Sequence, residues 1–397
     1  MRILSIFGTR PEAIKMAPLV RRLEAEPGVQ SVVCVTGQHQ TMLRQVLDLF
    51  GIVPDHDLEA MTADQTLNGL AARLFAGLDG VLAAVAPDRV LVHGDTTTSA
   101  AGALAAFHRR IPVGHVEAGL RTGNLHEPWP EEMNRRVVDV VSDLLFAPTA
   151  SAAANLRAEA LGGRAIVTGN TVIDALRLMC AQLDGDAALR ARLDAQLPFP
   201  DDGKPIVLVT GHRRESFGAG FAHICAALAA LAQTGRMRIV YPVHLNPNVR
   251  GPVLAALGNV PHVHLTEPLE YAGFVRLMQR AALVLTDSGG VQEEAPSLGK
   301  PVLVMRDVTE RPEALAAGTV RLVGTDREAI VAAVMALVDD EDERRAFARR
   351  VNPYGDGRAS ERIVAALTGR PFEPFASEAL PGYRHPALRA WRKATAG

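Results

Sequence analysis

The sequence is poor in cysteine, the residue that marks disulfide-stabilised secreted proteins. It has only three cysteines, Cys34, Cys180 and Cys225. They form neither a C-x-x-C pair nor an even disulfide set, so a reducing compartment is expected. No cluster of His, Cys, Asp and Glu has the spacing of a metal site. The chain also lacks a G-x-G-x-x-G or Walker A motif, so neither a nicotinamide nor ATP hydrolysis is expected, and we predict no cofactor.

Net charge and long apolar stretches are limited as well. The 397 residues carry a formal net charge of −2, which gives no basis for a nucleic-acid or membrane surface. No apolar run is expected to reach membrane-spanning length, and residues 1–8 lack the apolar region and cleavage site of a signal peptide. We therefore expect a cytoplasmic protein without membrane or nucleic-acid partners. Since 397 residues exceed one ordinary core, two domains are expected.

Short apolar runs alternate with longer helical patterns along the chain. Such nearly continuous hydrophobic runs are typical of parallel strands buried on both faces, and their alternation with helices predicts doubly wound α/β sheets. We predict Rossmann-like domains over 1–183 and 204–352, a helix over 353–370 that returns to the first domain, and a tail over 371–397 of unassigned position. Strands are expected at Ile3–Phe7, Ser31–Val35, Arg89–His93, Pro112–Val116, Leu144–Ala147, Ala165–Thr168, Ile206–Thr210, Arg238–Val243, His262–Thr266, Leu283–Thr286, Pro301–Met305 and Val320–Val323.

The segment Asp287–Glu294 carries the clearest ligand signal. It follows an apolar run that is predicted to be a buried strand, and Gly289 and Gly290 let backbone N–H groups approach an anion at a helix start. Glu294 lies about one turn inside, where its carboxylate can accept hydrogen bonds from sugar hydroxyls. The combination suits a nucleotide diphosphate joined to a sugar, although a glycine pair between strand and helix is often only a tight turn.

Polar motifs in the first half follow predicted strands in the same way. Thr9-Arg10-Pro11-Glu12 is a capping box, and Arg10 and Lys15 at this helix start can meet a phosphate or a carboxylate. Each further acidic residue could simply cap a helix or complement its dipole. Three carboxylates at one edge of a domain can also supply the proton donor and acceptor of sugar chemistry. These carboxylates are Asp95, Glu117 and Glu131.

The matching loop of the second half holds His212, beside Arg213 and Arg214. A histidine at the carboxyl end of a strand is a candidate phosphate ligand or acid. Ligands of doubly wound sheets bind beyond the carboxyl ends of the strands. The motifs of both halves therefore predict one site, in a cleft between the domains.

Through these motifs the chain resembles the non-hydrolysing UDP-N-acetylglucosamine 2-epimerases of bacteria. The match includes the Asp95, Glu117, Glu131 and His212 motifs and the segments Phe7–Lys15, Asp287–Glu294, Thr309–Glu313 and Asn352–Gly357. The resemblance implies two Rossmann-like domains in the glycosyltransferase-B arrangement with a central cleft, and a homodimer. It implies interconversion of UDP-N-acetylglucosamine and UDP-N-acetylmannosamine for surface polysaccharide synthesis. UDP would leave by elimination and add back after proton delivery to the other face of carbon 2, without a redox cofactor.

The resemblance also implies roles for particular positions. Asp95, Glu117 and Glu131 would be the acid and base groups near the sugar, with His212 as a further catalytic candidate, and the group that takes the proton stays open. The diphosphate would be bound by Arg10, Lys15, His212, Ser288, Gly289 and Gly290. The nucleoside would be bound by Leu269 and Phe274 at the uracil, where relatives can carry a polar residue in place of Leu269, by Glu294 at the ribose, and by Arg311.

Activation and reaction type have open alternatives. Gln38 and His39 match a site at which some relatives bind a second UDP-N-acetylglucosamine as an activator, but Thr41 and Asp64 replace the glutamine and arginine expected there. A hydrolysing epimerase that releases N-acetylmannosamine and UDP, a glycosyltransferase on the same fold, and a nucleotide-sugar sensor are the alternative classes, which fold alone does not separate.

Overall fold

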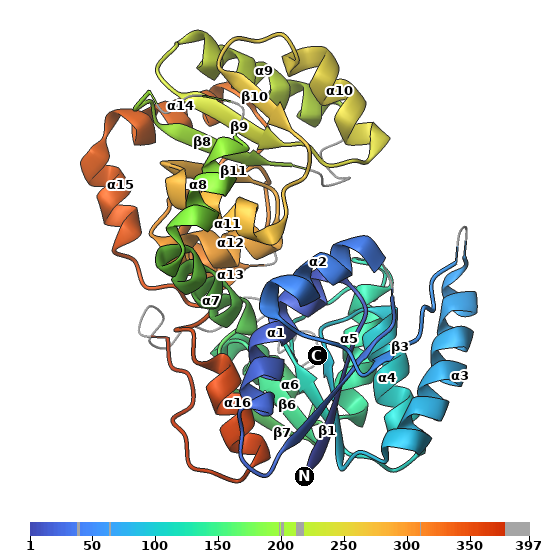
Figure 1. Ribbon diagram of the computed structural model, residues 1–397. Helices are drawn as coiled ribbons and strands as arrows, with labels where there is room; N and C mark the ends of the chain where they lie inside the picture. Colours follow the sequence, from blue (N-terminus) through green and yellow to red (C-terminus); the bar gives the residue numbers. More distant parts are fainter. Residues whose placement is uncertain are drawn as a thin grey trace, which may run out of the picture. The chain divides into compact units, whose positions relative to one another are not determined.

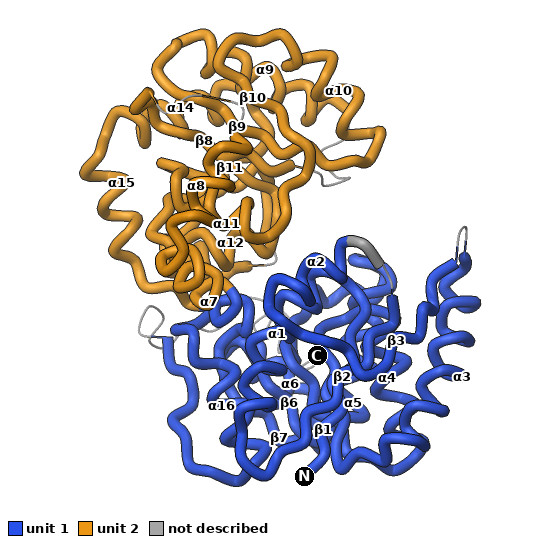
Figure 2. The backbone as a smooth tube through the Cα atoms, in the orientation of Figure 1, with its two compact units in different colours: residues 1–175, 354–377, 381–397 blue, residues 176–353, 378–380 orange. Residues whose placement is uncertain are grey.

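The chain folds into two compact units. The computed structural model describes residues 1–37, 40–62, 65–197, 199, 202–211, 218–309 and 311–377. The first unit holds residues 1–175 and 354–377, and the second holds residues 176–353 (Figure 2). Each unit is built on its own parallel β-sheet with helices between the strands (Figure 1). The predicted α/β class with two parallel sheets is therefore confirmed.

The first sheet has seven strands in the order β3-β2-β1-β4-β5-β6-β7. Strand order reverses between β1 and β4, and ligands of open α/β sheets bind at such a switch point, beyond the carboxyl ends of the strands. The strands lie within two residues of the predicted runs except β3, a two-residue strand that was not predicted. Their bounds are β1 (Arg2–Phe7), β2 (Gln30–Val35), β3 (His56–Asp57), β4 (Arg89–His93), β5 (Val113–Val116), β6 (Leu144–Ala147) and β7 (Arg164–Val167).

Alternation along β1 explains why this sheet is covered on both faces. Ile3 and Phe7 belong to one apolar cluster with α1, α2 and α16, whereas Leu4 and Ile6 belong to another with α3 and α4. Successive side chains of a strand point to opposite faces, so a strand apolar throughout needs helices on both. The helices of this unit are α1 (Arg10–Glu24), α2 (Gln40–Phe50), α3 (Leu67–Val85), α4 (Thr97–His108), α5 (Glu131–Val141), α6 (Ala150–Ala158) and α16 (Ala359–Leu367), and α7 (Thr171–Gly185) spans the boundary between the units.

Helix α3 corrects one expectation from the sequence. No apolar run of membrane-spanning length was expected, yet these 19 residues are long and apolar enough by length and composition alone. One side of α3 is buried in the cluster that covers β1 and β4. A single helix of this kind is weak evidence for a membrane span, because the core helix of a globular unit can have the same length and apolar composition.

The second sheet has six parallel strands in the order β10-β9-β8-β11-β12-β13, with its switch point between β8 and β11. Its strands are β8 (Ile206–Thr210), β9 (Arg238–Pro242), β10 (Val263–Thr266), β11 (Leu283–Thr286), β12 (Val302–Val304) and β13 (Val320–Leu322). Its helices are α8 (Ala187–Ala195), α9 (Ala219–Gln233), α10 (Pro247–Leu257), α11 (Tyr271–Arg280), α12 (Gly289–Glu294), the 3₁₀ turn η2 (Ala295–Leu298), α13 (Pro312–Ala316), α14 (Arg327–Asp339) and α15 (Glu341–Ala348).

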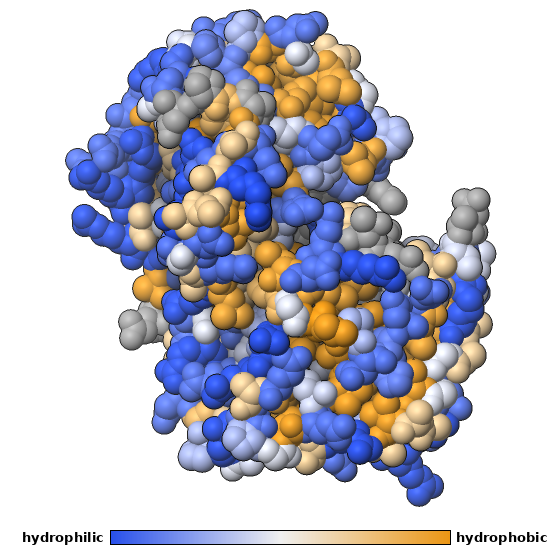
Figure 3. Space-filling view, in the orientation of Figure 1, coloured by the Kyte–Doolittle hydropathy of each residue, from blue (hydrophilic) through white to orange (hydrophobic). Residues whose placement is uncertain are grey.

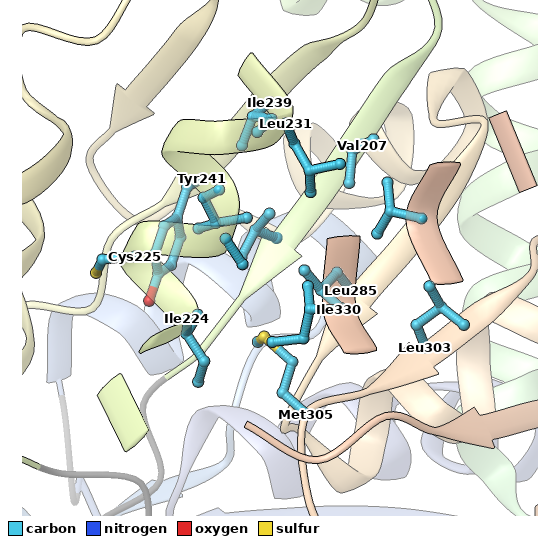
Figure 4. Packing of buried hydrophobic residues seen from close by; sticks show 14 of the residues in the cluster. Val207, Ile224, Cys225, Leu231, Ile239, Tyr241, Leu285, Leu303, Met305 and Ile330 are labelled. Atoms are coloured by element: carbon cyan, nitrogen blue, oxygen red, sulfur yellow. The ribbon is translucent and has the colours of Figure 1, made fainter. Parts of the chain in front are cut away.

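The core of the second unit lies between this sheet and helices α9 and α14. Strand side chains such as Val207 and Leu285 pack against Leu231 and Ile330 from the helices (Figure 4). On the surface, hydrophilic side chains cover α15 and apolar ones gather over α9 and α10 (Figure 3). Tyr241 is buried in the core, and its hydroxyl donates to the carbonyl of Gly211 at 2.7 Å. That bond fixes the chain directly after β8.

The C-terminal helix α16 is part of the first unit. Its Ile363 and Val364 are buried in the cluster with α1. The carboxylate of Asp174 accepts from the backbone N–H groups of Ala359 and Ser360, at 3.1 and 2.7 Å. These bonds satisfy donors that a helix start leaves without partners.

Candidate active site

A pocket of about 450 Å³ lies at the carboxyl ends of β1, β4 and β5 in the first unit. This is the switch point of the sheet, where a ligand is expected. Four residues singled out from the sequence meet here, namely Lys15, Asp95, Glu117 and Glu131. The full lining is Thr9, Pro11, Glu12, Lys15, Leu67, His93, Gly94, Asp95, Thr96, Thr97, Glu117, Pro130, Glu131 and Asn134.

Glu12 is a buried carboxylate in the pocket lining that holds neighbouring segments together by hydrogen bonds. Thr9 and Glu12 form the predicted capping box at the start of α1. The buried Glu12 carboxylate also accepts from the hydroxyls of Thr96 and Ser99, at 2.7 and 2.9 Å, and from the backbone N–H of Gly8 at 3.0 Å. Burial raises the pKa of Glu12, and these hydrogen bonds oppose that rise. The residue therefore ties the loop after β1 to the start of α4.

Glu117 occupies a strained position directly after β5. Its φ of 70° lies in the left-handed region, which costs a non-glycine residue about 1–3 kcal/mol and is concentrated at functional sites. Its carboxylate is paired with the Lys15 ammonium and accepts from Asn170 Nδ2 at 2.8 Å. Its backbone N–H donates to the carbonyl of Phe146 at 3.1 Å. The fold thus presents this carboxylate to the pocket and holds it beside a cation.

Asp95 is held by the first turns of α5. Its carboxylate is paired with the guanidinium of Arg135, and Asn134 Nδ2 donates to its backbone carbonyl at 2.9 Å. Arg135 in turn donates to the buried Glu132 at 2.8 Å. The sequence analysis missed both the guanidinium and the amide. One signal was available, because Glu131 and Arg135 are four residues apart and share a helix face.

Glu131 differs from the other two pocket carboxylates. It is the first residue of α5, and within the described residues its side chain makes no hydrogen bond or ion pair. The adjacent Glu132 is fully buried and accepts from the backbone N–H of Thr122 at 3.1 Å. Glu132 is therefore a structural carboxylate, whereas Glu131 lines the pocket.

A buried polar network connects the loops that carry these carboxylates. His115 Nδ1 lies 2.6 Å from Asp139 Oδ1, and His115 Nε2 lies 2.8 Å from the carbonyl oxygen of Gly94. Asp139 also accepts from Arg121 at 2.7 Å and from the backbone N–H of Gly119 at 3.3 Å. Burial alone would raise the pKa of Asp139, but His115 and Arg121 lower it below the ordinary value. This network fixes the residues that flank Asp95 and Glu117, and the sequence analysis did not find it.

In the second unit, the predicted anion segment leaves β11 as expected. Ser288 is the N-cap of the short helix α12, which begins at Gly289 and Gly290. Glu294 is buried, and the hydroxyl of Tyr271 donates to its carboxylate at 2.9 Å. These residues lie at the switch point between β8 and β11, the same place in the sheet as the pocket of the first unit.

The remaining nucleotide candidates of the second unit lie around this segment. Arg311 is paired with the buried Glu293, whose backbone carbonyl accepts from Asn352 Nδ2 at 2.7 Å. Leu269 and Phe274 are half-buried, one before α11 and the other in its first turn. Arg311 is thus fixed by its neighbours.

Some of the candidates stand apart from these groups. Arg10 is the first residue of α1 and is half-buried, and burial lowers its pKa. It does not contribute to the described lining of the pocket. His212, Gln38 and His39 lie outside the described residues, as does Asp64.

Comparisons with known proteins agree with one another. A family model described as UDP-N-acetylglucosamine 2-epimerase matches residues 21–368. The chain is 58% identical to the UDP-N-acetylglucosamine 2-epimerase of Escherichia coli (strain K12) over 369 residues, which cover 92% of this chain and 98% of that protein. It is 49% identical to the enzyme of that name from Campylobacter jejuni over 371 residues, which cover 92% and 97%.

Solved structures show the same similarity. The UDP-GlcNAc 2-epimerase of Neisseria meningitidis, bound to UDP-GlcNAc, has a TM-score of 0.88 and 48% identity, and the match covers 93% of this chain and 100% of that one. The enzyme of Methanocaldococcus jannaschii in complex with UDP-GlcNAc and UDP has a TM-score of 0.79 and 32% identity, with the same coverage.

Proposed function

Because this chain belongs to the UDP-N-acetylglucosamine 2-epimerase family, we propose that it interconverts UDP-N-acetylglucosamine and UDP-N-acetylmannosamine without net hydrolysis. The observation that carries the proposal is the pocket that places Asp95, Glu117 and Glu131 around one space at a switch point. Acid and base groups within reach of one sugar carbon are what a change of configuration at that carbon needs.

The reaction we propose proceeds by elimination. The proton at carbon 2 is not acidic while UDP is attached, because no carbonyl group neighbours it on the ring. As the bond from carbon 1 to UDP breaks, positive charge develops on the ring and a carboxylate can take that proton. A glycal and UDP result. A proton delivered to the other face of carbon 2, followed by re-addition of UDP at carbon 1, gives the epimer.

Lys15 and the second unit have supporting roles in this proposal. Lys15, together with Arg10, His212 and the Ser288–Gly290 segment, would hold the departing diphosphate, since helix starts and cations stabilise anions. Glu294 would accept from the ribose hydroxyls, with Arg311 completing the nucleotide pocket and Leu269 and Phe274 lining the uracil. These roles follow from the family resemblance, position by position.

The wider setting is proposed on the same basis. The two units would face each other across a cleft in the glycosyltransferase-B arrangement, and the protein would act as a cytoplasmic homodimer in the supply of surface polysaccharide precursors. We also infer that the two units close on UDP, because closure would keep water away from the reactive glycal.

Turnover of UDP-N-acetylglucosamine in deuterated water tests the proposal. The expected product is UDP-N-acetylmannosamine with deuterium at carbon 2. Epimer that retains the original hydrogen would refute elimination at carbon 2. Free N-acetylmannosamine and UDP as the main products would instead favour the hydrolysing class, and transfer of the sugar to an added acceptor would favour the glycosyltransferase.

A further inference from the structure

His93 is a buried histidine in the wall of the pocket that contains Asp95, Glu117 and Glu131. It is the last residue of β4, two positions before Asp95, and the residue is 3% exposed. Within the described residues neither ring nitrogen has a hydrogen-bond partner. Nearby polar groups such as Thr96 and Ser99 are all bonded to Glu12. His93 therefore stands out from its surroundings.

An unpartnered buried polar group calls for an explanation. Leaving such a group without a hydrogen bond costs about 1–3 kcal/mol, and native proteins keep few of them. Burial lowers the pKa of His93 to about 3, so the ring is neutral at pH 7 and has one N–H donor and one acceptor nitrogen. Glu117 Oε2 lies 3.9 Å from Nε2 of His93. A shift of about 1 Å would bring the two atoms into hydrogen-bond range.

The ammonium of Lys15 has two candidate anionic partners, the carboxylate of Glu117 and the diphosphate of the proposed function. Here it is paired with Glu117, whereas the proposed function assigns it to the diphosphate. One ammonium cannot give its full charge to both. When a diphosphate arrives, Glu117 would lose part of its strongest partner while its carboxylate still has to be held beside the sugar.

We infer that His93 is a positioning residue for Glu117, whose carboxylate receives the Nε2–H of His93 when a diphosphate draws Lys15 away. Glu117 thus exchanges a charged partner for a neutral one as substrate binds. Asn170 Nδ2 donates to the same carboxylate at 2.8 Å and would keep holding it during this exchange. The inference rests on the proposed function only in taking the anion to be the diphosphate of a nucleotide.

The charges around His93 come from several elements. Lys15 lies on α1, Glu117 follows β5, and His115 lies on β5. Asp95 and Glu131 line the same pocket. A neutral donor suits this setting, because a second cation beside Lys15 would repel it, whereas an uncharged N–H supports a carboxylate without adding charge.

Nuclear magnetic resonance of the full chain labelled with ¹⁵N-histidine tests the inference without any turnover. The His93 signal is assigned by its loss in His93→Gln. We expect a neutral ring with the proton on Nε2 at pH 7, and a downfield shift of that proton on addition of saturating UDP. A charged ring, a proton on Nδ1, or a signal that UDP does not move would overturn the inference. A failed epimerase assay would leave these outcomes unchanged.

Kinetics of two matched variants provide the second test. Glutamine carries an amide N–H near the position of Nε2, whereas leucine has no donor. His93→Leu should lower kcat about tenfold or more, the worth of a hydrogen bond to a charged group. It should also move the acid limb of the kcat profile to higher pH, because a carboxylate that loses a donor binds a proton more readily. His93→Gln should stay close to the native enzyme in both respects.

Controls separate positioning from packing. Unchanged UDP affinity by calorimetry in both variants would show that the pocket still folds. His108→Leu, at an exposed histidine on α4, should leave kcat and its pH profile as they are. Equal losses in His93→Leu and His93→Gln with a native pH profile would mean that His93 only fills space, and would overturn the inference.

Discussion

The buried Asp139 network offers a sharp test of how the carboxylates are held. Asp139 is fully buried and is bonded to His115, Arg121 and the backbone N–H of Gly119. Asp139→Asn keeps the shape of the side chain but removes its charge. Removing one partner of a buried ion pair typically costs about 3–5 kcal/mol. Because Arg121 keeps its pair with Glu159, we expect a loss near the lower end, about 3 kcal/mol.

The same change should lower turnover. His115 and Asp139 fix the backbone at Gly94, directly before Asp95, and at Gly119, two residues after Glu117. A displacement of about 1 Å in a catalytic group can cost about 100-fold in rate. We therefore expect kcat to fall while UDP affinity stays near the native value, because UDP is assigned to other residues.

Urea unfolding and steady-state kinetics at pH 7 measure both effects. Asp143→Asn is the matched control, since Asp143 pairs with Arg89 at a half-exposed site and such pairs contribute about 0–1 kcal/mol. The folded-state pKa of Asp139 is lowered, so its contribution is present above the unfolded pKa and is lost as pH falls through the folded value. The difference in stability should thus persist at neutral pH and shrink only below the ordinary range of an aspartate. A variant as stable as Asp143→Asn, with native turnover, would refute this reasoning.

Three further predictions concern the proposed reaction. Asp95→Asn, Glu117→Gln and Glu131→Gln should each lower kcat about 100- to 10,000-fold with UDP binding retained, and near-native turnover in any one removes that residue from the acid and base groups. His212→Ala and Glu294→Gln should weaken UDP binding in calorimetry, and an unchanged Kd would argue against their nucleotide roles. UDP should reduce the radius of gyration in solution scattering, since each unit supplies part of the proposed diphosphate site; an identical value at saturating UDP would contradict closure on the nucleotide.

The strands were predictable because parallel strands buried on both faces leave long apolar runs in the sequence. Ile3–Phe7 and Leu283–Thr286 illustrate this, since each lies within a residue of an observed strand. Strand β3 could not be predicted, because its two residues are too few to show an apolar run or an alternation. Its pairing with β2 is a contact between separate segments of the chain. The apolar length of α3 was underestimated because Asn68, Arg73 and Asp79 interrupt the apolar run, although the helix as a whole is apolar in composition.

The gathering of Asp95, Glu117 and Glu131 was predictable for a different reason. Carboxyl ends of parallel strands meet at one edge of a sheet, so acidic residues that follow β4 and β5 must come close to each other. Their partners were not predictable in the same way, because Lys15 and Glu117 are 102 residues apart. Nothing in the local pattern of either segment identifies the other.

Helix α5 shows where local pattern and long-range pairing meet. Glu131, Arg135 and Asp139 follow one another at intervals of four, so they lie along one face of the helix. The first faces the pocket, the second pairs with Asp95, and the third joins the network that fixes Gly94 and Gly119. A polar stripe on a helix is usually its solvated face, yet Asp139 is fully buried and Arg135 nearly so. Since burying a charge is costly unless it is paired, such a stripe on a buried helix implies partners on the neighbouring strand ends, and Asp95 after β4 and His115 on β5 are two of these partners.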